Sequence, residues 1–121
     1  MNQAVLTVLI AGLLPIVCAG IAKWGVKDFD NRHPRQWLAT LEGRRARANA
    51  AQENSFEAFP VFAVGVALAL FREADPLAVA QCGWFFVAMR VAYIYCYVTD
   101  RAGARSIVWT LGLLAVLRLY A

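Results

Sequence analysis

Two short runs of polar side chains interrupt otherwise apolar stretches of the chain. In the first run Asn54 and Glu57 are three residues apart, and in the second Arg90, Tyr93 and Tyr97 are three and four apart. Both spacings place the side chains of a run on one face of a helix. Arginine pairs bidentately with a carboxylate, and glutamate can hold an ammonium group. Together the two runs predict a site for a small zwitterionic ligand with several carboxylates.

Three further polar residues flank these runs. Arg47 precedes Asn54 by seven residues, Gln52 stands between them, and Arg105 follows the second run at the start of another apolar stretch. The helix dipole disfavours a cation at a helix start, which favours a functional reason for Arg105. A fixed guanidinium would stabilise a thiolate, because a free thiol has a pKa of ~8.5 and is mostly protonated at neutral pH. Arg105, like the tyrosine hydroxyls, could therefore stabilise a thiolate or another developing anion.

The same residues also have structural interpretations. Glu57 could simply be neutralised by Arg90 or by Arg47, and Arg47 could anchor its helix at the membrane interface. The tyrosines could belong to an interfacial aromatic belt. We favour the belt for Tyr95, because this residue points off the face that Tyr93 and its partners share.

The patterns of several other kinds of site are absent. His33 is the only histidine, and Cys18, Cys82 and Cys96 have no ligand-like spacing. There is no Ser-His-Asp order, no phosphate-binding glycine loop and no dinucleotide fingerprint. We therefore expect no metal at the site.

Composition predicts the elements that position these residues. The chain has 121 residues, of which 61% are hydrophobic and 17% charged, whereas soluble domains are about 45–50% apolar and about 25% charged. Charge-poor runs that can cross a ~30 Å hydrocarbon layer predict an all-α membrane protein, a four-transmembrane-helix bundle with helices at about 3–23, 50–72, 76–98 and 103–120. The prediction is one domain over 1–121, with a long connection at about 24–49.

The distribution of basic residues predicts the orientation of this integral multi-pass protein. Nine of the twelve Lys and Arg residues fall in the first and third loops, against two, Arg72 and Arg118, on the other side. The positive-inside rule then places loops one and three in the cytoplasm and both termini outside. The excess of basic residues therefore reflects the orientation of the protein in the membrane. We expect a lipid bilayer as its partner and no nucleic acid.

At these residues the chain resembles the MAPEG family, the membrane-associated proteins in eicosanoid and glutathione metabolism. It looks like a bacterial-type member of this family that resembles the microsomal glutathione transferases. The matching positions, in chain order, are Arg47, Asn54, Glu57, Pro60, Arg90, Tyr93, Tyr97, Arg105 and Gly112. The resemblance implies a MAPEG-like four-helix subunit that assembles as a homotrimer, in the inner membrane if the protein is bacterial.

The resemblance also implies a function, with glutathione as co-substrate bound between neighbouring subunits near the cytoplasmic face. Arg105 would face the thiol, and the implied glutathione-binding residues are Asn54, Glu57, Arg90, Tyr93, Tyr97 and, by weaker matches, Arg47 and Gln52. The implied activity is that of a transferase or peroxidase, which conjugates glutathione to, or reduces, a lipophilic electrophile or hydroperoxide. This small-molecule substrate would enter from the bilayer through a slot shaped by Phe59, Phe62, Trp109 and Leu113.

The sequence departs from the family pattern in two places. Members with well-understood sites often have an arginine four residues before the motif asparagine, where this chain has Ala50. The spacing between Tyr97 and the thiol-facing arginine also varies among branches of the family. Arg101 therefore competes with Arg105 for the position beside the thiol.

Two other functions compete with the enzyme. One is a non-catalytic lipid-binding or scaffold member of the same fold, but this chain keeps Arg105 and the tyrosines, which favours the enzyme. The other is a small four-helix multidrug exporter. Such a carrier is expected to place a carboxylate in the middle of its first helix, and residues 4–22 contain none.

Overall fold

The computed structural model describes residues 1–121 and contains five helices and no strand. The helices are α1 (Gln3–Lys23), α2 (Pro34–Ala39), α3 (Gly43–Phe71), α4 (Pro76–Val98) and α5 (Ala102–Tyr120). All but α2 are long and apolar enough to cross a membrane. The expected all-α bundle of four membrane-spanning helices is confirmed.

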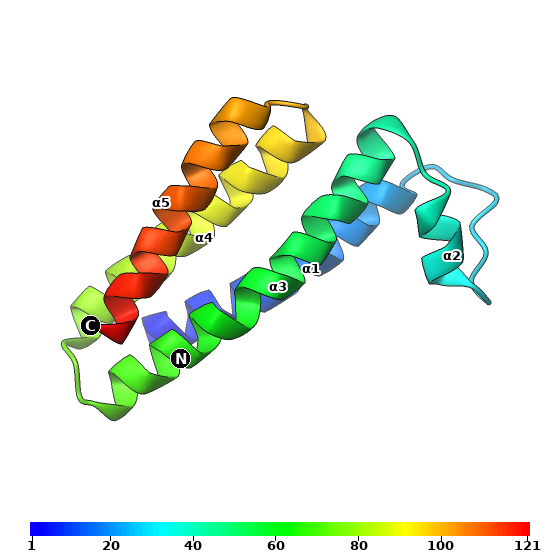
Figure 1. The fold of residues 1–121 in the computed structure, drawn as a ribbon. Coiled ribbons are helices and arrows are strands. Elements are labelled where there is room, and N and C mark those ends of the chain that lie inside the picture. Colours follow the sequence, from blue (N-terminus) through cyan, green and yellow to red (C-terminus); the bar gives the residue numbers. More distant parts are fainter.

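The four long helices form two antiparallel hairpins that pack against each other. α1 lies along α3 and α4 lies along α5, and both helices of the first hairpin also contact α4 (Figure 1). The two termini and the turn between α3 and α4 lie at one end of the bundle (Figure 1). The α1–α3 connection and the α4–α5 turn lie at the other end, which we call the loop end.

The predicted start of the second membrane-spanning helix differs from the start of α3 in the structure. α3 begins at Gly43, seven residues before the predicted start at residue 50, so the connection between the spans covers 24–42 and not 24–49. Hydropathy detects only the part of a helix that crosses the hydrocarbon layer. The added turns are rich in arginine and alanine, which are good helix formers but too polar to be read as membrane-spanning.

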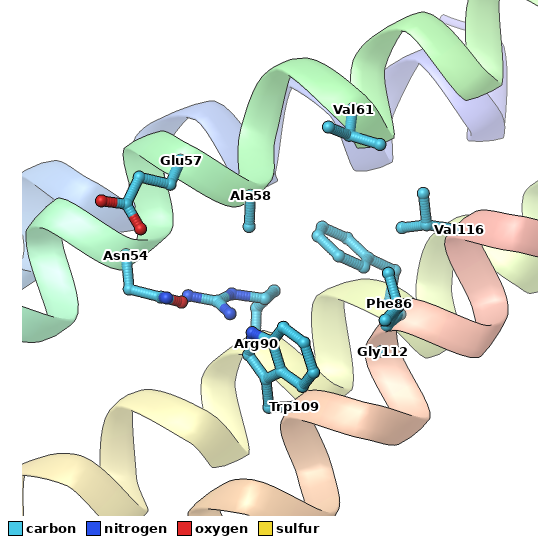
Figure 2. A pocket seen from close by; sticks show the side chains of 10 residues that line it. Asn54, Glu57, Ala58, Val61, Phe86, Arg90, Trp109, Gly112 and Val116 are labelled. Carbon is cyan, nitrogen blue, oxygen red and sulfur yellow. The ribbon is translucent and has the colours of Figure 1, made fainter.

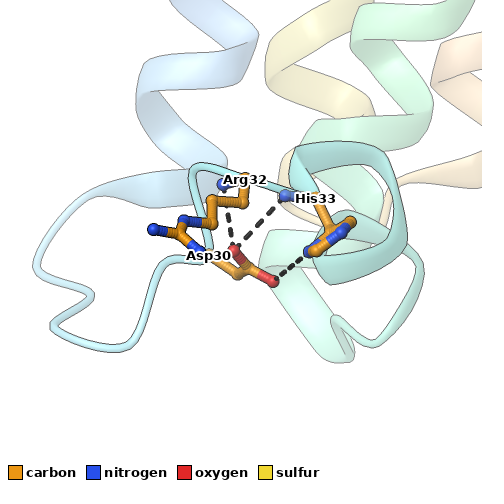
Figure 3. A network of polar contacts seen from close by, with 3 residues as sticks. All are labelled: Asp30, Arg32 and His33. Carbon is orange, nitrogen blue, oxygen red and sulfur yellow. Dashed lines mark hydrogen bonds and ion pairs between the residues drawn. The ribbon is translucent and has the colours of Figure 1, made fainter.

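A short helix, α2, orders the connection between α1 and α3. Pro34 is its first residue, a position where the missing N–H costs nothing. The Asp30 carboxylate accepts hydrogen bonds from the backbone N–H groups of Arg32, at 3.0 Å, and His33, at 3.3 Å, and contacts His33 Nδ1 at 3.1 Å (Figure 3). Phe29 packs edge-on against Trp37, with ring centroids 5.0 Å apart.

Arginines of the third helix and its end bind the C-terminal carbonyls of the other long helices. Arg45 donates to the carbonyl of Ala22 in α1 at 3.0 Å, and Arg47 donates twice to that of Val98 in α4, at 3.3 and 3.2 Å. Arg72 donates to the carbonyls of Tyr120 and Leu119 in α5, at 3.0 and 2.9 Å. These bonds satisfy carbonyls that a helix end leaves without partners, and they tie α3 to the other three spans.

The two hairpins approach each other closely at Gly83. A Cβ there would stand 3.0 Å from Cβ and 3.1 Å from Cγ2 of Thr7 on α1. Thr7 is fully buried, and its hydroxyl donates to the carbonyl of Ala4 at 2.7 Å, so the side chain cannot move aside freely. A glycine is therefore required where α4 crosses α1.

We expect Gly83→Leu to destabilise the protein by about 1–3 kcal/mol, the usual cost of overpacking a core. Thermal unfolding of the detergent-solubilised protein measures the change. Gly20→Leu is the matched control, because a Cβ at Gly20 meets nothing within 4 Å. Equal unfolding temperatures for the two variants would contradict the close α1–α4 contact.

Candidate functional site

A cavity of about 220 Å³ lies between α3, α4 and α5 and holds several of the predicted site residues. Asn54, Glu57 and Arg90 line its polar end (Figure 2). The remaining lining residues are Ala58, Val61, Phe86, Trp109, Gly112, Leu113 and Val116. The cavity therefore joins a charged, hydrogen-bonding end to an apolar chamber.

Arg90 is the charged group at the centre of this site. It is only 5% exposed, and its Nη2 donates a hydrogen bond to Ser55 Oγ on α3 at 3.1 Å. The only side-chain ion pair within 4.0 Å in the protein is that of His33 and Asp30, so neither Arg90 nor Arg47 neutralises Glu57. A buried guanidinium with a neutral hydroxyl as its hydrogen-bond partner retains the capacity to bind an anionic ligand.

A continuous stack of cations and aromatic rings leads from Arg90 to the predicted catalytic residue. The Arg90 guanidinium lies 4.2 Å from the ring centroid of Tyr93, which packs edge-on against Tyr97 at 5.6 Å. The Arg105 guanidinium lies 4.1 Å from the ring centroid of Tyr97. Cation–π contacts of this kind hold guanidinium groups in defined positions. The structure thus brings together four residues that the sequence predicted as one site.

The same stack distinguishes Arg105 from Arg101. Arg105 is half-buried and lies on the Tyr97 side of α4. Arg101 is exposed and lies 5.7 Å from the ring of Tyr95, which is itself 58% exposed. Of the two arginines, Arg105 is therefore the one that continues the line of site residues, and Tyr95 faces away from it as expected.

Two predicted amide residues have buried oxygen atoms without hydrogen-bond partners. These atoms are Oδ1 of Asn54 and Oε1 of Gln52. Figure 2 shows the Asn54 amide and the Arg90 guanidinium reaching toward each other from α3 and α4. Glu57 is exposed and turns its carboxylate away from the apolar end of the cavity (Figure 2). Unsatisfied buried polar atoms are rare in proteins, so these two oxygens are candidates to accept a hydrogen bond from a further partner.

Arg47, unlike the other predicted site residues, binds the carbonyl at the end of α4. Its Nε and Nη2 both donate to the carbonyl of Val98. This contact fits the anchoring role that the sequence left open for Arg47, because it holds the start of α3 against the end of α4.

Two of the four residues that the sequence predicted around a slot for a lipophilic substrate line the cavity. Trp109 and Leu113 line the cavity, but Phe59 and Phe62 do not. Phe62 is fully buried and stacks on Phe86 with ring centroids 4.0 Å apart, so it belongs to the hydrophobic core of the bundle. Phe59 is the ring nearest to where a Cβ on Gly12 would stand, at 3.2 Å, so it packs toward α1.

Sequence reasoning missed Ser55, the hydrogen-bond partner of Arg90. It stands directly beside Asn54 in the first polar run and is 4% exposed. A small polar residue inside the polar run of a membrane-spanning helix was the available signal. Phe86 and Val116, which shape the apolar chamber, carry no signal that separates them from ordinary core residues.

Comparison with known proteins identifies a family for nearly the whole chain. A model of the MAPEG family matches residues 4–121. No curated protein and no solved structure matches the chain.

Proposed function

The chain belongs to the MAPEG family, and on this premise we propose that it is a membrane-embedded, glutathione-dependent transferase or peroxidase. The observation that carries the proposal is the line of Arg90, Tyr93, Tyr97 and Arg105 beside a cavity with one polar and one apolar end. The polar end suits a peptide with two carboxylates and an ammonium group. The apolar chamber suits part of a lipophilic second substrate.

Each polar residue has a role in this proposal. Arg90 pairs with a glutathione carboxylate, Glu57 holds the ammonium group, and the Asn54 and Gln52 oxygens accept backbone N–H groups of the tripeptide. Arg105 stabilises the thiolate, which attacks the electrophilic carbon of a conjugation substrate and either displaces a leaving group or adds to a double bond that then takes up a proton. With a hydroperoxide the thiolate attacks the terminal peroxide oxygen and the O–O bond breaks, which gives glutathione sulfenic acid and an alkoxide that takes up a proton and leaves as the alcohol. The thiol of a second glutathione then attacks the sulfenic sulfur, which gives the disulfide and water.

The proposal includes a homotrimer with the glutathione site between subunits. Glu57 is exposed and unpaired on a helix that spans the membrane, and the Asn54 and Gln52 oxygens are unsatisfied within one chain. An ionised group at membrane depth is costly without a partner. A neighbouring subunit together with the bound peptide would supply those partners. The loop end, where most of the basic residues lie, would face the cytoplasm.

Glutathione binding tests the proposal directly. We expect equilibrium dialysis of the purified protein in detergent to show binding at millimolar glutathione or below, and ultraviolet difference spectra to show a thiolate band. Absence of binding in this range would favour the non-catalytic scaffold. Binding without a thiolate band would overturn the role of Arg105 and leave the site as a peptide-binding site.

We expect Glu57→Gln to raise the KM for glutathione roughly 10- to 100-fold with little change in kcat. The amide keeps the size of the side chain but loses the charge, and hydrogen bonds to charged groups contribute about 1.5–3 kcal/mol. Initial-rate kinetics with varied glutathione measure the change. Glu53→Gln is the matched control, because Glu53 is exposed on the same helix, accepts from Asn49 Nδ2 at 3.4 Å and lines no part of the cavity.

A further inference from the structure

A second hollow region lies between α4 and α5 near the end of the bundle that holds the termini. It consists of two adjoining grooves of about 470 and 370 Å³ that share Ala78, Cys82 and Arg118. We call this region the Arg118 groove. Phe85, Leu111 and Leu114 form the apolar walls of its larger part. None of its lining residues lines the cavity between α3, α4 and α5, so the two are separate sites.

Arg118 is the free cation of this groove. It is exposed in the last turn of α5, and no carboxylate lies within 4.0 Å of its guanidinium. The other arginine at this end, Arg72, is engaged with the carbonyls of Leu119 and Tyr120. The Asp75 carboxylate is likewise engaged, because it accepts from the N–H groups that open α4. The groove therefore presents one unpaired positive charge above an apolar channel.

We propose that the Arg118 groove binds an anionic phospholipid, with the headgroup phosphate on Arg118 and an acyl chain between the walls of the groove. Arg118 lies in the last turn of a helix that is long and apolar enough to cross a membrane, and long basic side chains near such helix ends extend to the lipid headgroups. The channel leads from this level along α4 and α5 toward the membrane interior, where acyl chains lie. A zwitterionic lipid fits less well, because its ammonium group is repelled by the unpaired guanidinium.

Cys82 provides a reporter for occupancy of the groove. It is half-buried and lines both parts, whereas Cys18 and Cys96 are buried elsewhere. An acyl chain in the groove would cover the Cys82 thiol. Its rate of alkylation by N-ethylmaleimide, followed by mass spectrometry of the intact protein, therefore measures occupancy without reference to enzymatic activity.

The test compares the full-length protein in nanodiscs of phosphatidylglycerol and of phosphatidylcholine with matched acyl chains. We expect Cys82 alkylation to be about tenfold slower in phosphatidylglycerol. Arg118→Gln should abolish this difference, and Arg118→Lys should keep most of it, because lysine also binds phosphate. Arg101→Gln is the control, since Arg101 is an exposed arginine at the opposite end of α5. Native mass spectrometry of the same variants, with retained phosphatidylglycerol counted per chain, provides a second readout.

Four results would overturn the proposal. Equal alkylation rates in both lipids for the natural sequence would show that the groove does not select an anionic headgroup. An unchanged lipid difference in Arg118→Gln, or an equal loss in Arg101→Gln, would show that Arg118 does not hold it. Protection of Cys82 in detergent that rises with protein concentration would show that a second copy of the chain covers the groove.

Discussion

Arg105→Ala is expected to lower kcat for glutathione-dependent turnover about 10²- to 10³-fold, the usual cost of removing one fixed group that stabilises a developing anion. The guanidinium lies 4.1 Å from the Tyr97 ring, which holds it at the end of the line of site residues. Alanine at a helix start is a good helix former, so α5 should still form. The loss should therefore appear in chemistry and not in folding.

Two measurements identify the cause of this loss. The ultraviolet thiolate band on adding glutathione should vanish in Arg105→Ala, while equilibrium dialysis should still detect bound peptide. Arg101→Ala is the control, because it removes an arginine four residues away that contacts only the exposed Tyr95 ring. If Arg101→Ala lost the band and Arg105→Ala retained full turnover, the assignment of the thiol-facing arginine would be reversed.

The fold could be predicted largely from the lengths of the apolar runs. The bilayer requires that a chain this apolar satisfy its backbone within helices, so the number of spans and most of their ends follow from hydropathy. The start of α3 did not follow, because Gly43 to Asn49 are helical although they are too polar for hydropathy to assign them to a span. There the structure depends on contacts between elements, such as that of Arg47 with Val98, which hydropathy does not contain.

Only part of the site could be predicted, because helical spacing relates residues of one helix and not residues of different helices. Helical spacing shows that Arg90, Tyr93 and Tyr97 share a face, and the structure places them in one stack with Arg105. Spacing within one helix does not give the rotation of α3 relative to α4. That rotation brings Ser55 to Arg90 and directs Phe62 into the core.

The arginines also show that position in the sequence does not by itself determine the role of a side chain. Arg45, Arg47 and Arg72 bind carbonyls at the ends of other helices, whereas Arg90 and Arg105 stack on tyrosines. All five are cations at or near the ends of apolar stretches, so charge counting assigns them one role. What separates them is whether a helix end lies within reach, and only the packing of the bundle decides that.

Arg90→Met is expected to weaken glutathione binding by roughly 100-fold while the protein remains folded. Loss of one partner from a buried, hydrogen-bonded charge pair typically costs about 2–5 kcal/mol of binding free energy. Methionine has a similar length and fills the space of the buried side chain. Replacing a buried charge by an apolar residue of similar volume is often neutral for stability. The variant thus separates the charge of Arg90 from its volume.

Ser55→Ala completes this test, because it removes the hydroxyl that the Arg90 guanidinium binds at 3.1 Å but keeps the charge. We expect it to weaken glutathione binding about tenfold, which corresponds to the net contribution of one hydrogen bond to a charged group. Dialysis gives the affinities, and thermal unfolding in detergent shows whether each variant is folded. Since both changes act through the same guanidinium, Ser55→Ala should have little further effect in the Arg90→Met background. Additive losses in the double variant would show that Ser55 acts on the ligand by a route other than Arg90, and unchanged binding in folded Arg90→Met would remove Arg90 from the site.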